Sequence, residues 1–301
     1  MSLVHWDDLD PVRVEDGEIA ATWWRIGEAA GSRQVGANRI LLDPGKRSTP
    51  AHVHLGEEEI FFVLEGSGLA WLDGTTFEVR AGDCLVHRPS AEAHTLVAGG
   101  SGLDVLAFGD RPRANATFLP EASALRLGTR WYRVEALPGR PPDVLEVPAP
   151  GPRPSAVVNV DDVEGADWRV GDDVGGLSKE LGAVAGSRFA GLNLDIVPPG
   201  LLNTTPHYHS AEEELFVVLA GEGVLLLGDA EHPVRAGHVV ARPAGTKIAH
   251  AFRAGPEGIS VLLYGTREPN DITYYPRSGI FALRGIGLVA RLEPVSPDEI
   301  R

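Results

Sequence analysis

Short runs of alternating apolar and polar residues make up most of this chain. Residues 69–72 and 77–79, for example, lie on either side of an Asp-Gly pair at positions 73 and 74, which is a strong signal for a β-hairpin. The chain has 36 glycines and 23 prolines, and turn signals punctuate it at intervals of about 8 to 12 residues. Stretches with a helical period are scarce. The pattern predicts an all-β protein built from many short strands.

The second half of the chain repeats the first. Residues 45–66 and 200–221 align without a gap, at a constant offset of 155 positions (207 − 52 = 155). A Pro-Gly pair opens both segments and predicts a turn at the same place in each. We therefore expect two domains of similar fold.

Prolines separate the two repeats. Seven of them fall between residues 137 and 154, and this composition predicts an extended, semi-rigid linker rather than a packed element. The sequence thus predicts an N-terminal domain over residues 1–137, a Pro-rich linker over 138–154 and a C-terminal domain over 155–301. Each of the two segments is long enough to form its own core.

The first repeat carries three histidines and one glutamate at metal-ligand spacing. In a strand, His52 and His54 share one face of the sheet, and a turn after them brings Glu59 to their side. His94, downstream of an Arg-Pro pair, completes the set. Imidazole and carboxylate donors that converge in this way bind divalent transition metals. A single His-x-His pair more often lies on a surface or in a hydrogen-bonded core, so it carries little weight alone.

The second repeat carries the same set, namely His207, His209, Glu214 and His250. The separation of first and last histidine is 42 positions in the first copy (94 − 52) and 43 in the second (250 − 207). This repetition favours a metal site over surface decoration. Whether one or both sets are occupied is left open.

These motifs resemble those of the cupin superfamily. The pattern G-x5–6-H-x-H-x3–4-E-x6-G, followed by G-x5–6-P-x-G-x2-H, occurs twice, so the chain looks like a bicupin. Two departures, Ala91 in place of the usual glycine and two extra residues before His250, affect a loop and remove no ligand. The resemblance implies two tandem double-stranded β-helix (jelly-roll) barrels packed against each other. It is also compatible with a homodimer.

Charge and cysteine content narrow the classes of partner. The 301 residues carry a formal charge of −15, which argues against binding to nucleic acid or to an anionic membrane surface. The single cysteine, Cys84, excludes an intrachain disulfide and suits a reducing compartment; its apolar surroundings predict a buried thiol. No signal peptide and no apolar segment approaching about 18 residues is evident. We expect a soluble, cytoplasmic protein whose partner is a small molecule.

An ion on three imidazoles and one carboxylate keeps a net charge of about +1 and two open positions, which suit an anionic chelating molecule beside dioxygen or water. The mixed donors favour Mn or Fe(II), with Ni, Zn, Co and Cu as alternatives. Arg88 and Arg242, which precede the motif prolines, are candidates to bind a substrate carboxylate, the alternative being structural ion pairs.

The resemblance implies a range of activities, because cupins with this ligand set include dioxygenases, oxalate-degrading enzymes and isomerases. We expect a metal-dependent oxygenase or lyase that acts on a small oxygenated or anionic organic molecule. The alternatives are a non-catalytic protein that binds metal and a small molecule for sensing, storage or structure, and a metal-dependent isomerase.

Overall fold

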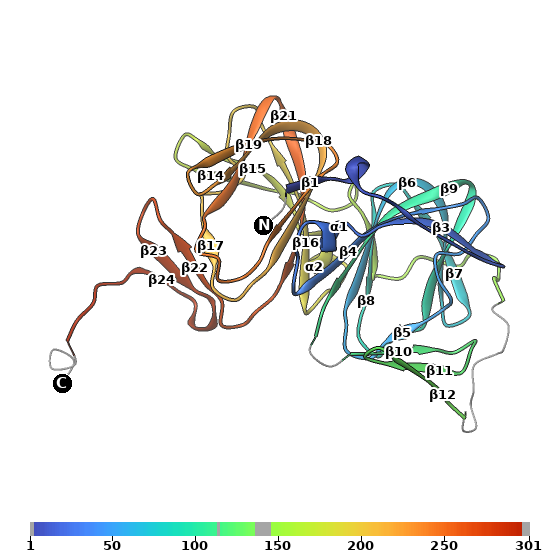
Figure 1. Ribbon diagram of the computed structural model, residues 1–301. Coiled ribbons are helices and arrows are strands. Elements are labelled where there is room, and N and C mark those ends of the chain that lie inside the picture. The colour runs from blue at the N-terminus through green and yellow to red at the C-terminus, as the bar shows by residue number, and fades with distance from the viewer. Residues whose placement is uncertain (1–2, 113–114, 136–145, 297–301) are drawn as a thin grey trace.

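Two β-barrels lie side by side in the structure (Figure 1). The computed structural model describes residues 3–112, 115–135 and 146–296. The elements of the first half are β1 (Leu3–His5), the 3-10 turn η1 (Trp6–Asp8), β2 (Val12–Asp16), β3 (Ile19–Trp24), α1 (Ile26–Ala29), β4 (Val35–Leu42), β5 (Val53–His54), β6 (Glu59–Leu72), β7 (Thr75–Arg80), β8 (Asp83–His87), β9 (His94–Asp110), β10 (Ala116–Leu119), β11 (Ala124–Leu127) and β12 (Arg130–Arg133).

The second half repeats this order. Its elements are β13 (Val157–Asn159), β14 (Ala166–Val170), β15 (Val174–Lys179), α2 (Leu181–Val184), β16 (Ala190–Val197), β17 (Tyr208–His209), β18 (Glu214–Leu227), β19 (Ala230–Arg235), β20 (His238–Arg242), β21 (His250–Thr266), β22 (Ile272–Tyr275), β23 (Ile280–Leu283), η2 (Arg284–Ile286) and β24 (Leu288–Arg291).

Each half forms one eight-stranded and one four-stranded antiparallel sheet. In the first half the large sheet has the order β13-β8-β6-β9-β4-β3-β2, with β7 paired to β6, and the small sheet has the order β12-β11-β10-β5. The second half has the orders β1-β20-β18-β21-β16-β15-β14, with β19 paired to β18, and β17-β22-β23-β24. The expected all-β fold with two tandem jelly-roll barrels is confirmed.

The two large sheets exchange an edge strand. β1, from the start of the chain, pairs with β20 of the second barrel, where Leu3 lies opposite Val240. β13, from the start of the second repeat, pairs with β8 of the first barrel, where Val157 lies opposite Leu85. Each large sheet therefore contains one strand from the other half of the sequence.

Apolar residues of both halves join in one core cluster at the barrel interface. The rings of Phe108 and Tyr264 stack there, with centroids 5.1 Å apart and planes 10° from parallel. Helices α1 and α2 contribute the buried residues Ile26 and Leu181 to the same cluster. Each barrel has a further core of its own. The two barrels are thus packed against each other through apolar surface, as expected.

Two buried glutamates clamp this interface from opposite sides. Glu58 accepts hydrogen bonds from Ser187 Oγ and from the backbone N–H groups of residues 188–190. Glu213, the equivalent residue of the second half, accepts them from Ser32 Oγ and from the N–H groups of residues 33 and 34. Both carboxylates have 0% exposure. The interface thus resembles the two-fold contact of a homodimer, formed within one chain.

Steric crowding explains why a glycine closes each histidine motif. Gly66 and Gly221 have φ of +88° and +74°, and a Cβ there would lie 2.4 Å and 2.3 Å from the carbonyl oxygens of Gly102 and Gly258. Both lie beside register shifts in the long central strands. Only glycine fits this bulge, which bends β6 and β18 around their barrels.

Part of the predicted linker, residues 138–145, lies outside the described residues. The described part follows the first barrel: Trp71 Nε1 donates to Glu146 O at 2.9 Å, and Thr76 Oγ1 donates to Pro148 O at 2.8 Å. The predicted limits of the two domains stay a prediction. Cys84 is fully buried, as its apolar surroundings predict.

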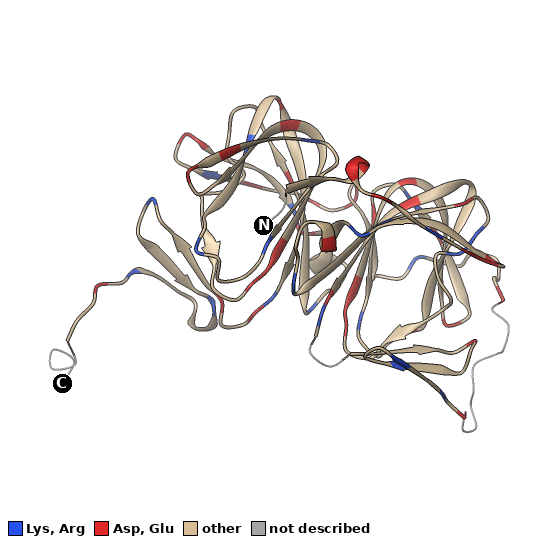
Figure 2. Ribbon diagram, viewed as in Figure 1, with Lys and Arg blue, Asp and Glu red and all other residues tan. Residues whose placement is uncertain are grey.

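Acidic and basic residues are scattered over both barrels (Figure 2). Among the residues that the structure describes, no helix has both the length and the apolar character that crossing a membrane requires.

Candidate metal centres

In the first barrel the predicted ligands meet at the ends of three strands. His52 and His94 face each other in a backbone bridge, with N–H to O distances of 3.1 and 2.9 Å between them. His54 lies on β5, and Glu59 opens β6. The carboxylate oxygen Oε2 of Glu59 lies 2.9 Å from the Nε2 atom of His94, 3.7 Å from that of His52 and 3.8 Å from that of His54. Three imidazoles thus converge on one carboxylate oxygen.

The second barrel forms the same arrangement. His207 and His250 are bridged through their backbones. The Nε2 atoms of His207 and His209 lie 3.1 Å apart, and Glu214 Oε2 lies 2.9 Å from His250 Nε2 and 3.4 Å from His209 Nε2. The structure therefore brings together all four predicted residues of each set. That they bind metal stays a prediction.

Backbone carbonyls orient several of these imidazoles. Nδ1 of His52 lies 3.0 Å from Pro50 O, and Nδ1 of His207 lies 2.9 Å from Thr205 O. Since a carbonyl oxygen only accepts, each Nδ1 must carry the proton and donate it. The Nε2 lone pair then points into the cluster, which is the tautomer that a metal ligand requires.

The two barrels differ in what holds their second histidine. Nδ1 of His209 lies 2.6 Å from Asp271 Oδ2, in a contact between an imidazole and a fully buried carboxylate. Nδ1 of His54 lies 3.3 Å from the hydroxyl of Thr117, and the position equivalent to Asp271 is Asn115, whose side chain donates to Glu57. A threonine hydroxyl lies near Nδ1 in both barrels, but a carboxylate at 2.6 Å orients the imidazole only in the second; in the first, Glu57 Oε2 lies 3.5 Å from His54 Nδ1.

The pKa values of these two histidines are shifted in opposite directions. Burial lowers the pKa of His54 to about 4, although the Glu59 charge acts in the opposite direction. Burial also disfavours protonation of His209, but the Asp271 and Glu214 carboxylates outweigh it and raise its pKa to about 10. At neutral pH and without metal, His54 is neutral and His209 is charged.

The glutamate of each set is held ionised. Burial opposes the charge of Glu59 and Glu214, but the neighbouring imidazoles outweigh it and keep the pKa of both carboxyls well below its usual range. A carboxylate that is ionised at neutral pH can bind a cation without first losing a proton.

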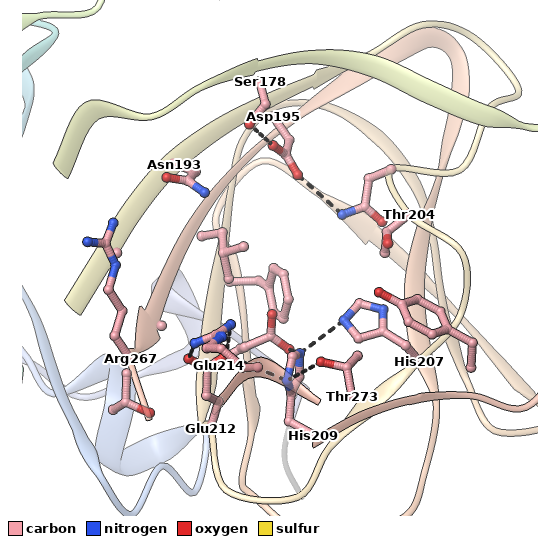
Figure 3. A pocket seen from close by; sticks show the side chains of 18 of the residues that line it. Ser178, Asn193, Asp195, Thr204, His207, His209, Glu212, Glu214, Arg267 and Thr273 are labelled. Atoms are coloured by element: carbon pink, nitrogen blue, oxygen red, sulfur yellow. Dashed lines mark hydrogen bonds and ion pairs between the residues drawn. The ribbon is translucent and has the colours of Figure 1, made fainter. Parts of the chain in front are cut away.

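A cavity of about 760 Å³ opens beside the second cluster (Figure 3). His207, His209 and Glu214 lie at one end of it, and Ser178 and Asp195 lie at the other. Its remaining polar and aromatic lining includes Trp168, Asn193, Asn203, Thr204, Glu212, Phe216, Arg267, Thr273, Tyr275 and Arg284. A small organic molecule fits in this space beside the histidines.

The first cluster has less room around it. A cavity of about 480 Å³ lies nearby, and of the described residues that line it, His54 is the one that belongs to the ligand set. Inside the barrel the ring of His87 stacks on His94 at 3.9 Å, and Phe61 meets His94 edge-on at 6.1 Å. The stacked ring of His87 is the difference from the second barrel, which has Arg242 at that position; the edge-on phenylalanine is common to both, since Phe216 lies 5.4 Å from His250.

Comparison with known proteins places the chain in a family. The cupin domain family (Cupin_2) matches residues 38–107 and 193–263, so all eight predicted ligands fall within the matched segments. The chain is a bicupin.

Relatives and solved structures resemble this bicupin over different lengths. An uncharacterized protein of Methanocaldococcus jannaschii is 34% identical over 84 residues, which cover 28% of the chain and 66% of that protein, just under two thirds of its length. The structure of a mutant oxalate decarboxylase from Bacillus subtilis matches this chain with a TM-score of 0.59 at 18% identity. The match covers 89% of this chain and 78% of the decarboxylase chain.

The structure of the oxalate decarboxylase of Lactobacillus farciminis, in complex with formate, matches with a TM-score of 0.58 at 16% identity. The match covers 88% of this chain and 86% of that decarboxylase chain. At these identities the likeness shows the fold, and not the activity.

The residues of the second cluster fit a metal ion. Glu214 Oε2 and His250 Nε2 are buried, and among the described residues they make no hydrogen bond outside the ligand set. Two ligands about 2.1 Å from one ion and at right angles lie about 3.0 Å apart. The observed separations of 2.9 and 3.1 Å match this value. Buried donor atoms that meet only one another, at coordination spacing, are what a cation would satisfy.

The two predicted arginines lie in different settings. Arg88 is exposed, whereas Arg242 has 3% exposure and donates to Thr246 Oγ1 and to Ile248 O. The described lining of the large cavity includes neither. In strand register His87, and not Arg88, is equivalent to Arg242, since they lie opposite Glu59 and Glu214. Their role in binding a substrate stays a prediction.

Sequence reasoning missed Asp271 and Tyr275. Asp271 contacts His209, and the ring of Tyr275 lies 5.5 Å from that of His207. Both belong to the segment after β21, whose repetition between the halves is visible in the sequence. At these two positions the repeat differs, with Asn115 and Leu119 in the first half. A change of residue within a repeated segment was the signal that could have found them.

Proposed function

We propose that the C-terminal barrel of this bicupin binds a divalent transition metal through His207, His209, Glu214 and His250, and that it acts on a small anionic, oxygenated organic molecule as a metal-dependent oxygenase or lyase. One observation carries the proposal. Three of the four donor groups, His207, His209 and Glu214, lie at one end of a cavity of about 760 Å³. The buried Glu214 Oε2 and His250 Nε2 lie 2.9 Å apart and make no hydrogen bond outside the ligand set among the described residues.

The donor set favours Mn or Fe(II). The set of three imidazoles and one carboxylate contains no thiolate, the ligand that would select Cu(I) or Zn. Ni, Zn, Co and Cu remain alternatives. A solved structure of Bacillus subtilis oxalate decarboxylase, with a TM-score of 0.58 at 17% identity, is described by its Mn(II) centres. That protein shares the fold, so the choice of metal rests on the donors.

The residues around the cluster support binding of an anion. Arg267 lines the cavity and supplies a positive charge (Figure 3), whereas the guanidinium of Arg284 is paired with Glu212. When bound, the metal supplies Lewis acidity and, for Mn or Fe, access to dioxygen chemistry. Asp271 holds the ring of His209 in place, and Phe216 and Leu263 keep part of the cavity wall apolar.

The first barrel supports a structural role for its own cluster. His52, His54, Glu59 and His94 supply the same donors, but the ring of His87 stacks on that of His94 and the nearby cavity is smaller, at about 480 Å³. We assign this cluster a metal that stabilises the fold. If neither barrel turns over a substrate, the protein is a non-catalytic bicupin that binds metal and a small molecule. An isomerase would turn over its substrate without consuming dioxygen.

The experiment combines metal content with turnover. Metal per chain is measured by plasma mass spectrometry in the wild type and in the His207→Ala and His52→Ala variants. Each protein, loaded with Mn or Fe(II), is then assayed for oxygen uptake and for carbon dioxide release with a panel of carboxylates and catecholates. We expect each variant to lose one metal and only His207→Ala to lose turnover.

Two outcomes contradict the proposal. A wild-type protein that takes up no metal after reconstitution lacks the centre altogether. Unchanged turnover in His207→Ala, with one metal lost, places the reaction outside the C-terminal barrel. Metal binding without turnover on any substrate favours the non-catalytic alternative.

A further inference from the structure

A buried acid lies at the end of the large cavity that faces the histidine cluster. Asp195, on β16, has 9% exposure. Its Oδ1 accepts a hydrogen bond from Ser178 Oγ at 2.8 Å, and its Oδ2 lies 3.5 Å from Asn203 Nδ2 (Figure 3). Asn203 is itself fixed, because its Oδ1 accepts from the backbone N–H of Phe252 at 2.8 Å. The carboxylate is therefore held in one orientation at the cavity wall.

The barrel fold does not require this acid. Ser178 lies opposite Asp195 in the pairing of β15 with β16, and the equivalent pair in the first barrel is Trp23 and Ile40. Two apolar residues thus occupy the same place in a barrel of the same topology. A buried carboxyl without a cationic partner costs stability, and burial raises the pKa of Asp195 accordingly. A polar ligand in the cavity would offset that cost.

The neighbouring wall offers neutral hydrogen-bonding groups. Asn193 lies two residues before Asp195, so both side chains leave the same face of β16 into the cavity. Thr204 adds a hydroxyl beside them. The groups that contact Asp195 among the described residues, Ser178 and Asn203, are neutral. Carboxylate, amide and hydroxyl groups gathered on one wall are the partners that hydroxyl groups of a ligand need.

We infer that Asp195, positioned by Ser178 and Asn203, accepts a hydrogen bond from a hydroxyl group of the substrate while the substrate's carboxylate end lies at the histidine cluster. The substrate class is then the hydroxylated carboxylic acids, in which the two kinds of group are separated by a short carbon chain. This inference rests on the proposed function, because the cluster must hold the acid end. Asp195 is thus a specificity-determining residue that touches the substrate away from the metal.

The test compares acids that differ only in their distal hydroxyl groups. Threonate is compared with 2-hydroxybutyrate, and gluconate with 2-hydroxyhexanoate; within each pair, chain length and the metal-binding end are the same. The protein is loaded with Co(II), and binding is followed by the change in the visible absorption of the Co(II) ion, so no turnover is needed. We expect one polyhydroxylated acid to bind at least about tenfold more tightly than its partner.

Three variants assign that preference. Asp195→Leu removes the acceptor and should abolish the preference while the affinity for the monohydroxylated acid changes little. Asp195→Asn keeps one acceptor oxygen and should retain part of it. Ile40→Leu, at the equivalent position of the first barrel, should leave it unchanged. Metal content and thermal unfolding of each variant show whether the site and the fold are intact.

The outcomes separate this inference from the proposed function. A protein that binds no Co(II), or whose Co(II) spectrum no acid changes, contradicts the proposed function. A spectrum that responds to both members of each pair equally, or a preference that survives in Asp195→Leu, overturns the role of Asp195 alone. Tighter binding of 4-amino-2-hydroxybutyrate than of threonate also overturns it, because Asp195 would then recognise a cation.

Discussion

The two barrels place the same four ligands in the same positions and surround them differently. In the first barrel His87 stacks on His94, and Trp23 and Ile40 form an apolar pair. In the second, Ser178 and Asp195 form a polar pair across a cavity of about 760 Å³. The ligand set therefore predicts metal in both barrels, and the residues outside the motif decide which barrel has room for a substrate.

The groups that contact the Nδ1 atoms of His54 and His209 also differ between the two barrels. His209 is held by the carboxylate of Asp271 at 2.6 Å, whereas His54 has the hydroxyl of Thr117 at 3.3 Å and the carboxylate of Glu57 at 3.5 Å. A carboxylate increases the basicity of a metal-bound imidazole and fixes its orientation more firmly than a hydroxyl does. The second barrel thus has both the larger cavity and the more strongly supported ligand.

The largest expected effect is on turnover. His250→Ala removes a ligand beside the cavity, and we expect the rate to fall by at least about 100-fold, because an incomplete ligand set no longer holds the metal in place. His94→Ala removes the equivalent ligand of the first barrel and should leave turnover within about threefold. Steady-state rates, normalised to metal per chain, measure both. Equal losses in the two variants would show that the barrels do not divide their roles in this way.

The next effect is on metal affinity. Asp271→Asn removes the carboxylate that orients His209, and we expect the C-terminal site to bind metal about 10- to 100-fold more weakly. Thr117→Ala, which removes the weaker contact of His54, should change the N-terminal site by no more than a few-fold. Titration against a competing chelator measures both sites. A greater loss in Thr117→Ala would reverse the assigned order of the two sites.

A smaller effect concerns the interface, where the two halves are alike. Glu58→Gln and Glu213→Gln each replace a buried, charged acceptor by a neutral one, and we expect each to reduce stability by about 2 kcal/mol. Because the hydrogen bonds of the two glutamates are equivalent, the losses should agree. Denaturant unfolding of both variants, compared with the wild type, tests this. A loss in only one of them would show that the interface is energetically one-sided.

A further effect is a pH dependence of the metal-free protein. The pKa of His209 is raised from 6.5 to about 10, so its contribution to stability is complete below pH 6.5 and is lost as the pH rises toward 10. The pKa of His54 is lowered to about 4, so its contribution is present above pH 6.5 and is lost as the pH falls toward 4. Thermal unfolding between pH 5 and pH 10 should show both declines.

The Asp271→Asn variant provides the control for this pH dependence. Without the carboxylate, the pKa of His209 should return toward that of its counterpart, and the decline above pH 6.5 should become shallower. The decline on the acid side should persist, because burial lowers the pKa of both His54 and His207 to about 4 and neither depends on Asp271. An unchanged alkaline decline in the variant would mean that another group is responsible.

The ligand sets could be predicted from the sequence because their geometry is local. His52 and His54 are two residues apart in a strand, and the repeat at a constant offset identifies the glutamate and the third histidine. The barrel fold followed from the same repetition and from its resemblance to the cupin motifs. Short-range periodicity and a repeated spacing carry this information directly.

The polar wall and the strand exchange could not be predicted in the same way. Asn193 and Asp195 are two residues apart on β16 and so share one face of the strand, but this spacing does not show whether that face meets solvent or a cavity. The likeness of residues 4–9 to residues 158–163 showed that both repeats begin alike. It did not show that the first segment pairs with β20 and the second with β8, because pairing between distant strands depends on the whole fold.

The exchange of β1 and β13 has a consequence for how this protein is made. During synthesis the first barrel cannot obtain its outer strand until residues 157–159 have left the ribosome, and the second barrel must take up a strand that was made before the first barrel. Neither half produced alone would have a complete large sheet. Each would expose an unpaired edge strand that can pair with other chains and promote aggregation. The molecule thus resembles a domain-swapped dimer with its two subunits fused, and cutting the backbone between the barrels would leave them joined.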